Sequence, residues 1–529
     1  MNKQNITNNI PNRFYLLSFL AGASLVLAFA PLGFYPVAWI SIALLFYSLL
    51  QAKSKKQHFY LAWVYGIGMF GTGASWVFYS MHFYGHANIP VAATLTTVFV
   101  TLIALIIGLF GLLAYLFRYH HKVTRLLFFY PLMWVLIEWF RGWFLTGFPW
   151  LYLGNSQIDS VLANIAPITG VLGVSLFSAF LSGALASIFI FKAPNKILWV
   201  DIPNSNHIKV QRKNRFSHQF SALFIILSLF ISSWVAGQIF WTQPKGEPIT
   251  VSLVQGNIAQ EEKWLPENKR PILELYKSLT QKNWDSDLII WPETAIPDLF
   301  ARNMDDFILP LQQEAEANNT DLLLGAFYQN EQGQVENSVL ALTPEGRDIY
   351  SKRHLVPLTE YMPLLGYLRW LNTWISIPSD NLTAGTGATT LKLSHNIAQI
   401  SICYEDAYAS EILKGLPQAN MLINVSNDGW FTDSLEPHQH MEIARMRAIE
   451  TGRYLLRATN IGVSGIVDTK GKIIATAPPY STEVITHKVQ PFTGVTPFMR
   501  WGNGGIVMVI FLLSLLGYFT AATRKPEKE

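Results

Sequence analysis

The stretch Ile397-Ala398-Gln399-Ile400-Ser401-Ile402-Cys403-Tyr404-Glu405-Asp406 contains the only cysteine of the 529-residue chain. Its apolar and β-branched residues predict a buried strand that ends at Cys403, and the acidic pair after it predicts a turn or the start of a helix. A thiol at the carboxyl end of a strand is held by a rigid sheet and can face a crevice, as a nucleophile requires. The alternative is that Cys403 is a small buried hydrophobic residue, as most free cysteines are.

The composition of the chain predicts a membrane protein. Half of the residues are hydrophobic and 14% are charged, whereas about a quarter of the residues in a soluble chain are charged. The net charge of +4 is small and dispersed, which argues against a nucleic-acid partner. A single cysteine excludes an internal disulfide, so cysteine content does not indicate the compartment.

Eight apolar stretches are candidate membrane spans. They lie at residues 14–30, 36–50, 59–82, 91–117, 126–141, 162–191, 220–240 and 504–523. Lysine and arginine gather in the loops after the second, fourth and sixth stretches, and the alternate loops contain almost none. This positive-inside pattern predicts that both termini are cytoplasmic. Because seven spans precede the large polar region, that region is expected outside the inner membrane, in the periplasm of a bacterium.

The chain divides into three parts. Residues 1–241 are predicted to form a polytopic α-helical membrane block with seven spans, residues 248–490 an α/β domain, and residues 503–523 the last span. In the middle part short β-type runs alternate with amphipathic helices, which is typical of a layered α/β domain. Helices are expected at 267–283, 304–319 and 436–451, and strands at 250–255, 288–291, 322–328, 338–343, 391–393, 398–403, 421–426, 455–459, 464–468 and 473–477.

Two charged residues lie at the edge of the fifth apolar stretch. Glu138 and Arg141 are three residues apart and would share a helix face. They either pair with each other or leave Arg141 free to bind a lipid phosphate. The aromatic run at 143–150 that follows predicts a re-entrant turn at the membrane interface.

Three strand ends carry polar residues with complementary chemistry. The run 288–292 is followed by Glu293, the pair Tyr350-Ser351 is followed by Lys352, and the third strand ends at Cys403. A carboxylate beside a thiol can act as its base, and a lysine can lower the thiol pKa and stabilise an oxyanion. Taken singly, Glu293 could be a turn carboxylate and Lys352 a solvated surface lysine. Their presence together in one domain favours a catalytic group.

The motifs around these residues resemble the nitrilase superfamily, and the chain is similar to a membrane-embedded branch of it, the bacterial apolipoprotein N-acyltransferase family. The similar segments are Trp291-Pro292-Glu293-Thr294, Lys352-Arg353-His354-Leu355-Val356-Pro357 with Glu360-Tyr361, Cys403-Tyr404-Glu405, Glu138 to Trp150, Ser426-Asn427-Asp428-Gly429-Trp430-Phe431 and Arg445 to Asn460. The resemblance covers essentially the whole chain. It implies eight spans and an extracytoplasmic nitrilase-like (CN hydrolase) domain with an αββα sandwich fold.

The resemblance also implies an activity in lipoprotein maturation. A phospholipid would donate an acyl chain to the N-terminal amine of a diacylglyceryl apolipoprotein, by a ping-pong reaction through a Cys403 thioester. Glu293 would be the general base and Lys352 the oxyanion stabiliser. Four supporting residues are implied as well: Glu360 to orient Lys352 and the amine, Tyr404 to offer its backbone N–H to the oxyanion, Glu405 beside it, and Trp264 as a substrate contact. From the sequence alone Trp264 is equally a partly buried packing residue.

The segment Tyr361–Ile377 is unusually apolar for a domain outside the membrane. It predicts either a lid that dips toward acyl chains or a helix packed on the domain or on the membrane block.

No cofactor or metal is expected. His438 and His440 are two residues apart, which does not suit ligation from one helix, and no third ligand is evident in the sequence. Two other functions stay open. One is a membrane-anchored amidase of the nitrilase type, and the other is a non-catalytic membrane receptor or scaffold.

Overall fold

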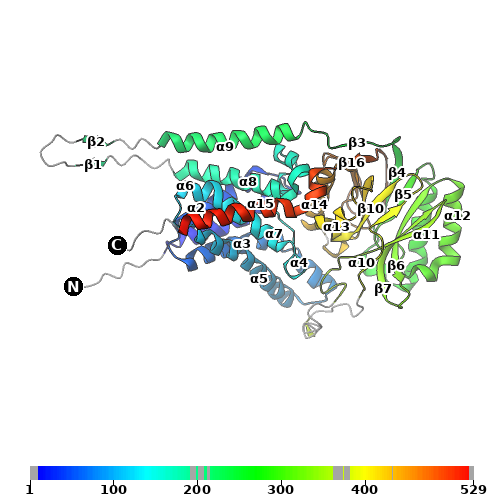
Figure 1. Cartoon of the computed structure of the whole chain (residues 1–529). Helices are drawn as coiled ribbons and strands as arrows, with labels where there is room; N and C mark the ends of the chain where they lie inside the picture. The colour runs from blue at the N-terminus through cyan, green and yellow to red at the C-terminus, as the bar shows by residue number, and fades with distance from the viewer. Residues whose placement is uncertain are drawn as a thin grey trace.

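The computed structural model describes residues 10–190, 198–200, 208–210, 215–361, 373–374, 382–431 and 433–522. A block of helices occupies one side of the molecule and an α/β sandwich the other (Figure 1). The last helix, α15 (Pro497–Ala522), returns from the sandwich into the helical block. The chain therefore leaves the helical block to build the sandwich and then comes back.

The helical block consists of apolar helices. They are α1 (Arg13–Ser24), α2 (Pro36–Gln51), α3 (Lys55–Gly73), α4 (Val77–Tyr79), α5 (Ile89–Leu116), α6 (Lys122–Thr124), α7 (Tyr130–Arg141), α8 (Ala166–Ile190) and α9 (Arg215–Ala236), together with α15. Glycines bring α1 and α3 close together, because a Cβ added at Gly22 would collide with the carbonyl oxygen of Tyr65, and one at Gly68 with that of Phe19. Such close backbone approach is typical of helices that pack within a membrane.

Among the described residues, five helices are long and apolar enough to cross a membrane. They are Ile89–Leu116, Lys122–Arg141, Val161–Ile188, Gln219–Ala236 and Pro497–Phe519. A sixth candidate is the pair Lys55–Gly73 and Val77–Tyr84, whose halves are bent by 62°. The first two predicted spans form the shorter apolar helices Arg13–Ala28 and Pro36–Gln51.

The charged residues at the edge of α7 bind the backbone of the aromatic turn. Arg141 is 1% exposed and donates to the carbonyl oxygens of Phe148, at 2.8 Å, and Trp150. Glu138 accepts a hydrogen bond from the N–H of Leu153 at 2.7 Å. The structure therefore shows neither alternative: among the described residues no salt bridge joins Arg141 to Glu138, and the buried guanidinium bonds carbonyl groups of the turn and is not exposed to a lipid phosphate.

Two six-stranded sheets form the sandwich. The first runs in the order β15 (Glu483–Val489), β4 (Ile249–Gln255), β5 (Leu288–Ile290), β6 (Asp321–Gln329), β7 (Val335–Thr343) and β8 (Gly346–Ser351). The second runs in the order β14 (Ile473–Thr476), β13 (Gly465–Val467), β12 (Leu455–Thr459), β11 (Met421–Ser426), β10 (Ile397–Ile402) and β9 (Thr390–Lys392). The central strands β4, β5 and β6 are parallel, as are β10, β11 and β12.

Two further strand pairs are short and antiparallel. They are β1 (Leu198–Val200) with β2 (Ile208–Val210), and β3 (Thr242–Pro244) with β16 (Phe492–Gly494). The second pair joins the beginning and the end of the sandwich segment, next to the helices that enter and leave the block.

Alternate side chains of the central strands fill the space between the two sheets. Leu253 of the first sheet and Ile400 of the second are fully buried there, and each such side chain contributes about 1.5–3 kcal/mol. The outward-facing side chains pack on helices α11 (Lys269–Gln281) and α12 (Leu309–Ala317) over the first sheet, and on α14 (Glu436–Thr451) over the second. The domain is thus an αββα sandwich, as the resemblance implied.

The ten strands predicted for this domain are present, with ends that differ by at most three residues. The sequence indicated β8 only by its end at Tyr350-Ser351, without bounds for the strand, and it did not indicate β15. Both lie at an edge of the first sheet, and most of their side chains are exposed or only partly buried. Edge strands of this kind lack the apolar run that marks a buried strand.

Helix α14 joins the sandwich to the helical block. Its side chains are buried on nearly every face although many of them are polar. Glu442 accepts a hydrogen bond from the N–H of Ala30 at 3.1 Å, and Glu450 accepts one from the N–H of Val171 at 2.7 Å. Val171 follows Gly170, whose left-handed φ of 68° breaks α8 and frees that N–H. Buried carboxylates therefore attach α14 to two segments of the helical block.

Replacing Glu450 by alanine should destabilise the protein. Glu450 Oε2 lies 2.9 Å from Arg447 Nη1, and both side chains are at most 2% exposed. The change leaves a buried guanidinium unpaired, which costs about 3–5 kcal/mol and should lower the melting temperature in detergent by several degrees. The control Glu274→Ala, in an exposed pair with Arg270, should leave the melting temperature unchanged. Equal melting temperatures for Glu450→Ala and the wild type would contradict the attachment through α14.

Candidate active site

Cys403 lies where β10 ends and a short 3-10 helix, η12 (Cys403–Ala407), begins. Its backbone is left-handed, with a φ of 55°, which costs a residue other than glycine about 1–3 kcal/mol. The surroundings hold this turn, since Asn424 of β11 donates to the carbonyl oxygen of Cys403 at 2.9 Å. The half-buried thiol therefore sits on a sharp, fixed turn at the end of a strand.

Lys352 lies between two carboxylates directly after β8. Its Nζ is 2.8 Å from Oε1 of Glu360 and 3.6 Å from Oε1 of Glu293, and its side chain is 1% exposed. Burial opposes the charge, but Glu360 and Glu293 outweigh it and raise the pKa of Lys352 above its ordinary value. Lys352 is therefore a permanent cation in the site.

Glu293 follows β5 and is held by an amide that the sequence analysis missed. Its Oε1 accepts a hydrogen bond from Nδ2 of Asn337 at 2.7 Å, and the same nitrogen lies 3.4 Å from Oε1 of Glu360. Asn337 of β7 therefore orients both carboxylates around Lys352. Its neighbours in the sequence give no indication of this role, because its partners come from other parts of the chain.

The thiol and the two charged residues interact. Burial raises the pKa of Cys403 well above its ordinary value, the charge of Glu293 raises it further, and Lys352 opposes the shift. The thiol is therefore protonated at neutral pH and needs a base before it can act as a nucleophile. The structure brings Glu293, Lys352 and Cys403 together with Glu360, from strand ends of both sheets.

Glu405 and Tyr404 connect the Cys403 turn with the Lys352 segment. Glu405 is fully buried and accepts four hydrogen bonds, from Tyr350 Oη and from the backbone N–H groups of Arg353, His354 and Ile402. Burial raises the pKa of Glu405 to about 7. The hydroxyl of Tyr404 donates to the carbonyl oxygen of Leu355 at 2.6 Å. Both oxygens of Glu405 are thus used to position protein segments.

Trp264 lies at the surface of the domain. One face of its ring stacks on Phe327, with centroids 5.7 Å apart, and the side chain is 44% exposed. The ammonium of Lys263 also lies over this ring, 5.5 Å from its centroid. Most of the predicted lid at 361–377 lies outside the described residues; within it the structure describes Tyr361, Thr373 and Trp374.

A buried group of charges packs behind the Cys403 turn. Arg457 of β12 donates to Asp406 at 3.0 Å and to Asp428 at 2.9 Å, and His440 of α14 lies 2.9 Å from Asp406. Burial and Arg457 lower the pKa of His440, but Asp406 and Asp428 outweigh them and raise it to about 10. The group therefore contains two cations that balance the two aspartates.

This group also contains the side chains best arranged for a metal ion among the described residues. Ligand atoms of Asp428, Glu436 and His440 lie within 4.8 Å of one another. However, the guanidinium of Arg457 already bonds Asp428 and lies 2.9 Å from Nδ1 of His440. The guanidinium of Arg457 therefore occupies the position where a metal ion would have to bind.

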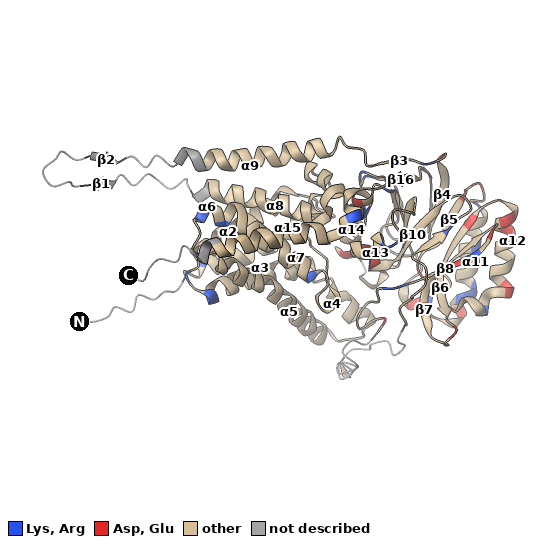
Figure 2. Cartoon of the chain, viewed as in Figure 1, with Lys and Arg blue, Asp and Glu red and all other residues tan. Residues whose placement is uncertain are grey.

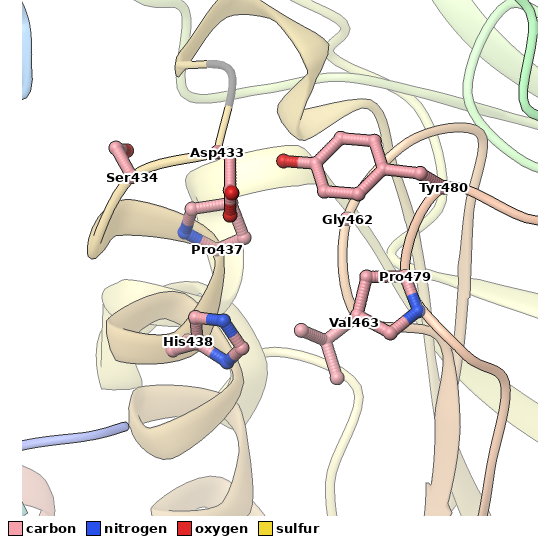
Figure 3. Close-up of a pocket in the computed structure, with 8 residues that line it drawn as sticks. All are labelled: Asp433, Ser434, Pro437, His438, Gly462, Val463, Pro479 and Tyr480. Carbon is pink, nitrogen blue, oxygen red and sulfur yellow. The ribbon is translucent and has the colours of Figure 1, made fainter. Parts of the chain in front are cut away.

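A separate small hollow lies beside the start of α14. It is lined by Asp433, Ser434, Pro437, His438, Gly462, Val463, Pro479 and Tyr480. Figure 3 shows the hydroxyl of Tyr480 directed toward Asp433 across this hollow. The lining includes neither Cys403 nor its charged neighbours, so the hollow is distinct from the group around Cys403.

Both parts of the chain match family models. Residues 250–496 match the model described as carbon-nitrogen hydrolase, and residues 21–184 match the model described as apolipoprotein N-acyltransferase N-terminal domain. The sandwich and its glutamate, lysine and cysteine thus define a carbon-nitrogen hydrolase domain that is joined to a block of apolar helices.

Known proteins with similar sequences identify one family within this class. The chain is 41% identical over 504 residues to the apolipoprotein N-acyltransferase of Methylococcus capsulatus, a match that covers 94% of this chain and 95% of the relative. Proteins of the same name from Coxiella burnetii and Nitrosomonas europaea are 37% and 35% identical, over 95% and 96% of this chain and 99% and 97% of theirs. The chain belongs to the apolipoprotein N-acyltransferase family.

Glu405→Gln should slow the reaction of Cys403 with a small alkylating agent. The amide has one acceptor oxygen and turns an NH2 group toward N–H donors, which weakens the buried contacts by about 1–3 kcal/mol. We expect iodoacetamide to alkylate Cys403 about ten-fold more slowly, as followed by mass spectrometry. Tyr350→Phe, which removes one of the four donors, should have a smaller effect. A wild-type rate in Glu405→Gln would contradict the positioning role of Glu405.

Proposed function

We propose that this protein transfers an acyl chain from a phospholipid to the N-terminal amine of a diacylglyceryl apolipoprotein through a thioester on Cys403. The observation that carries the proposal is the grouping of Glu293, Lys352 and Cys403 in a domain attached to apolar helices. A hydrolase for small soluble amides needs no such block. An enzyme that takes acyl chains from a bilayer needs its thiol near the membrane surface.

In the first half-reaction Glu293 takes the proton of the Cys403 thiol, and the sulfur attacks the ester carbonyl carbon of the phospholipid. Lys352 and the backbone N–H of Tyr404 stabilise the oxyanion that forms. Glu293 then returns the proton to the departing alkoxide. Lysophospholipid leaves, and the acyl chain stays on the sulfur as a thioester.

In the second half-reaction the neutral amine of the apolipoprotein attacks the thioester carbonyl carbon. Glu293 accepts a proton from the amine, the carbon–sulfur bond breaks, and the Cys403 thiolate recovers its proton. The Cys403 sulfur thus reacts with two large substrates in succession. The protein therefore does not need two lipid-sized pockets that meet at one atom. Such a sequence gives ping-pong kinetics.

The supporting residues have roles that suit their positions. Glu360, at 2.8 Å from Lys352, orients the ammonium and the incoming amine. Glu405 holds the Cys403 turn against the Lys352 segment. The exposed face of Trp264 contacts substrate at the rim of the domain.

We further infer that the protein spans the bacterial inner membrane eight times. The membrane block comprises residues 1–241, the periplasmic catalytic domain residues 248–490, and the last span residues 503–523. This number adds the two shorter helices and the bent pair, each counted as one span, to the five long helices. The charge distribution supports this orientation, because basic residues mark the end of the block remote from the sandwich, at α6 and the start of α3 (Figure 2).

Purified protein given a phospholipid with a labelled acyl chain should acquire a hydroxylamine-labile label on Cys403 and release lysophospholipid in a burst. Cys403→Ala should take up no label. Glu293→Gln should take it up about 100-fold more slowly, because the thiol has lost its base. The acyl-enzyme is measured by scintillation counting and by peptide mass spectrometry.

The same experiment separates the competing functions. Hydrolysis of small amides without any label would indicate an amidase. Neither label nor hydrolysis, in protein that binds diacylglyceryl peptides, would indicate a receptor or scaffold. A label that resists hydroxylamine would contradict the thioester.

The orientation is tested with single cysteines in a Cys403→Ala background. Glu331 and Lys55 are exposed, one in the sandwich and one at the start of α3. A membrane-impermeant maleimide should label Glu331→Cys in cells whose outer membrane alone is permeabilised, and Lys55→Cys only after the inner membrane is lysed. The reverse pattern would place the sandwich in the cytoplasm.

A further inference from the structure

A buried lysine beside Glu293 has no part in the mechanism above. Lys263 is the last residue of α10 (Gln260–Lys263) and is 2% exposed. Its Nζ lies 3.1 Å from the backbone carbonyl oxygen of Glu293 and 2.5 Å from Oγ1 of Thr294. Lysine is almost never fully buried unless it is paired. Here its partners belong to the residue that carries the proposed catalytic base and to the residue after it.

The backbone that Lys263 binds is strained. Thr294 has a left-handed φ of 46°, which is rare for a β-branched residue. On the other side of the same turn, a Cβ added at Gly325 of β6 would collide with the carbonyl oxygen of Pro292. The turn at Glu293 is therefore packed tightly against β6 and bonded by the Lys263 ammonium.

Lys263 also acts on Glu293 as a charge. Burial lowers the pKa of Lys263 to about 8, while the attraction of Glu293 works in the opposite direction. The Lys263 ammonium and the Glu293 carboxylate are therefore close enough to attract each other. The other titratable groups around this carboxylate are Lys352, Glu360 and Cys403. Lys263 is therefore the second cation near Glu293, in addition to Lys352.

We propose that Lys263 is a positioning residue for Glu293. Its ammonium fixes the strained turn that directs the carboxylate toward Cys403, and it places a positive charge near that carboxylate. This inference rests on the proposed function in one respect, namely the assignment of Glu293 as the base. It assigns no contact with substrate to Lys263.

The test follows alkylation of Cys403 by iodoacetamide between pH 5 and 9 in the full-length protein in detergent, which needs no lipid substrate. Lys263→Met keeps the length of the side chain and removes both its charge and its hydrogen bonds. We expect alkylation at pH 7 to slow about 10- to 100-fold. The acidic limb of the pH profile should move upward by about one unit, because the variant lacks a positive charge beside the proposed base.

Two more variants separate charge from hydrogen bonding. Lys263→Arg retains the cation and should keep the acidic limb near its wild-type position. Lys263→Gln retains a donor without the charge and should show the displaced limb. These two variants carry the test even if Lys263→Met does not fold, as judged by yield and melting temperature. The proposal is overturned if the acidic limb of the pH profile lies at the same pH in the charged and the uncharged variants of residue 263.

A matched control is Lys269→Met in the neighbouring helix. Lys269 lies 2.5 Å from Asp298, and its side chain is 33% exposed, so this change should leave the rate and the pH profile as in the wild type. A wild-type rate and profile in Lys263→Met would overturn the proposal, and so would an equal loss of rate at every pH. Because alkylation needs no phospholipid, a wild-type protein that fails to transfer acyl chains would refute the proposed function and leave this test intact.

Discussion

The candidate active site depends on keeping an ammonium group charged inside the protein. Lys352 is 1% exposed, and an isolated buried charge would cost several kcal/mol. The carboxylates of Glu360 and Glu293 compensate for this cost and at the same time fix the ammonium between them. With Lys263 bonded to the backbone at Glu293, two cations face two carboxylates. The local charge is thus balanced before any substrate arrives.

Polar contacts, rather than apolar packing, hold the Cys403 turn in its left-handed conformation. Glu405 joins it to the Lys352 segment, Asn424 bonds its carbonyl oxygen, and the Arg457 group packs behind it. Hydrogen bonds in a low-dielectric interior are strong and directional. They can therefore define the orientation of a backbone turn, which apolar packing alone would leave less sharply fixed.

Much of the sandwich and its three central residues could be predicted from the sequence, because each buried strand is a local apolar run and each predicted residue follows a strand end. Asn337, Lys263 and Arg457 could not be predicted in this way. Asn337 lies 44 residues from Glu293, and Arg457 lies 51 residues from Asp406, so their roles arise only when the sheets assemble. In the helical block, hydropathy located the apolar stretches but could not show that one of them bends by 62°.

The long-range contacts of α14 imply an order in which the parts of this chain assemble. The partners of Glu442 and Glu450 precede them by 412 and 279 residues. Contacts across such distances form late, because the entropy of closing a long loop must be offset first. The N-terminal helices are synthesised first, so the helical block can serve as a template when α14 emerges from the ribosome. Helix α15 follows the sandwich in the chain and packs on α7 and α8, so it can join the helical block only after the sandwich segment has been synthesised.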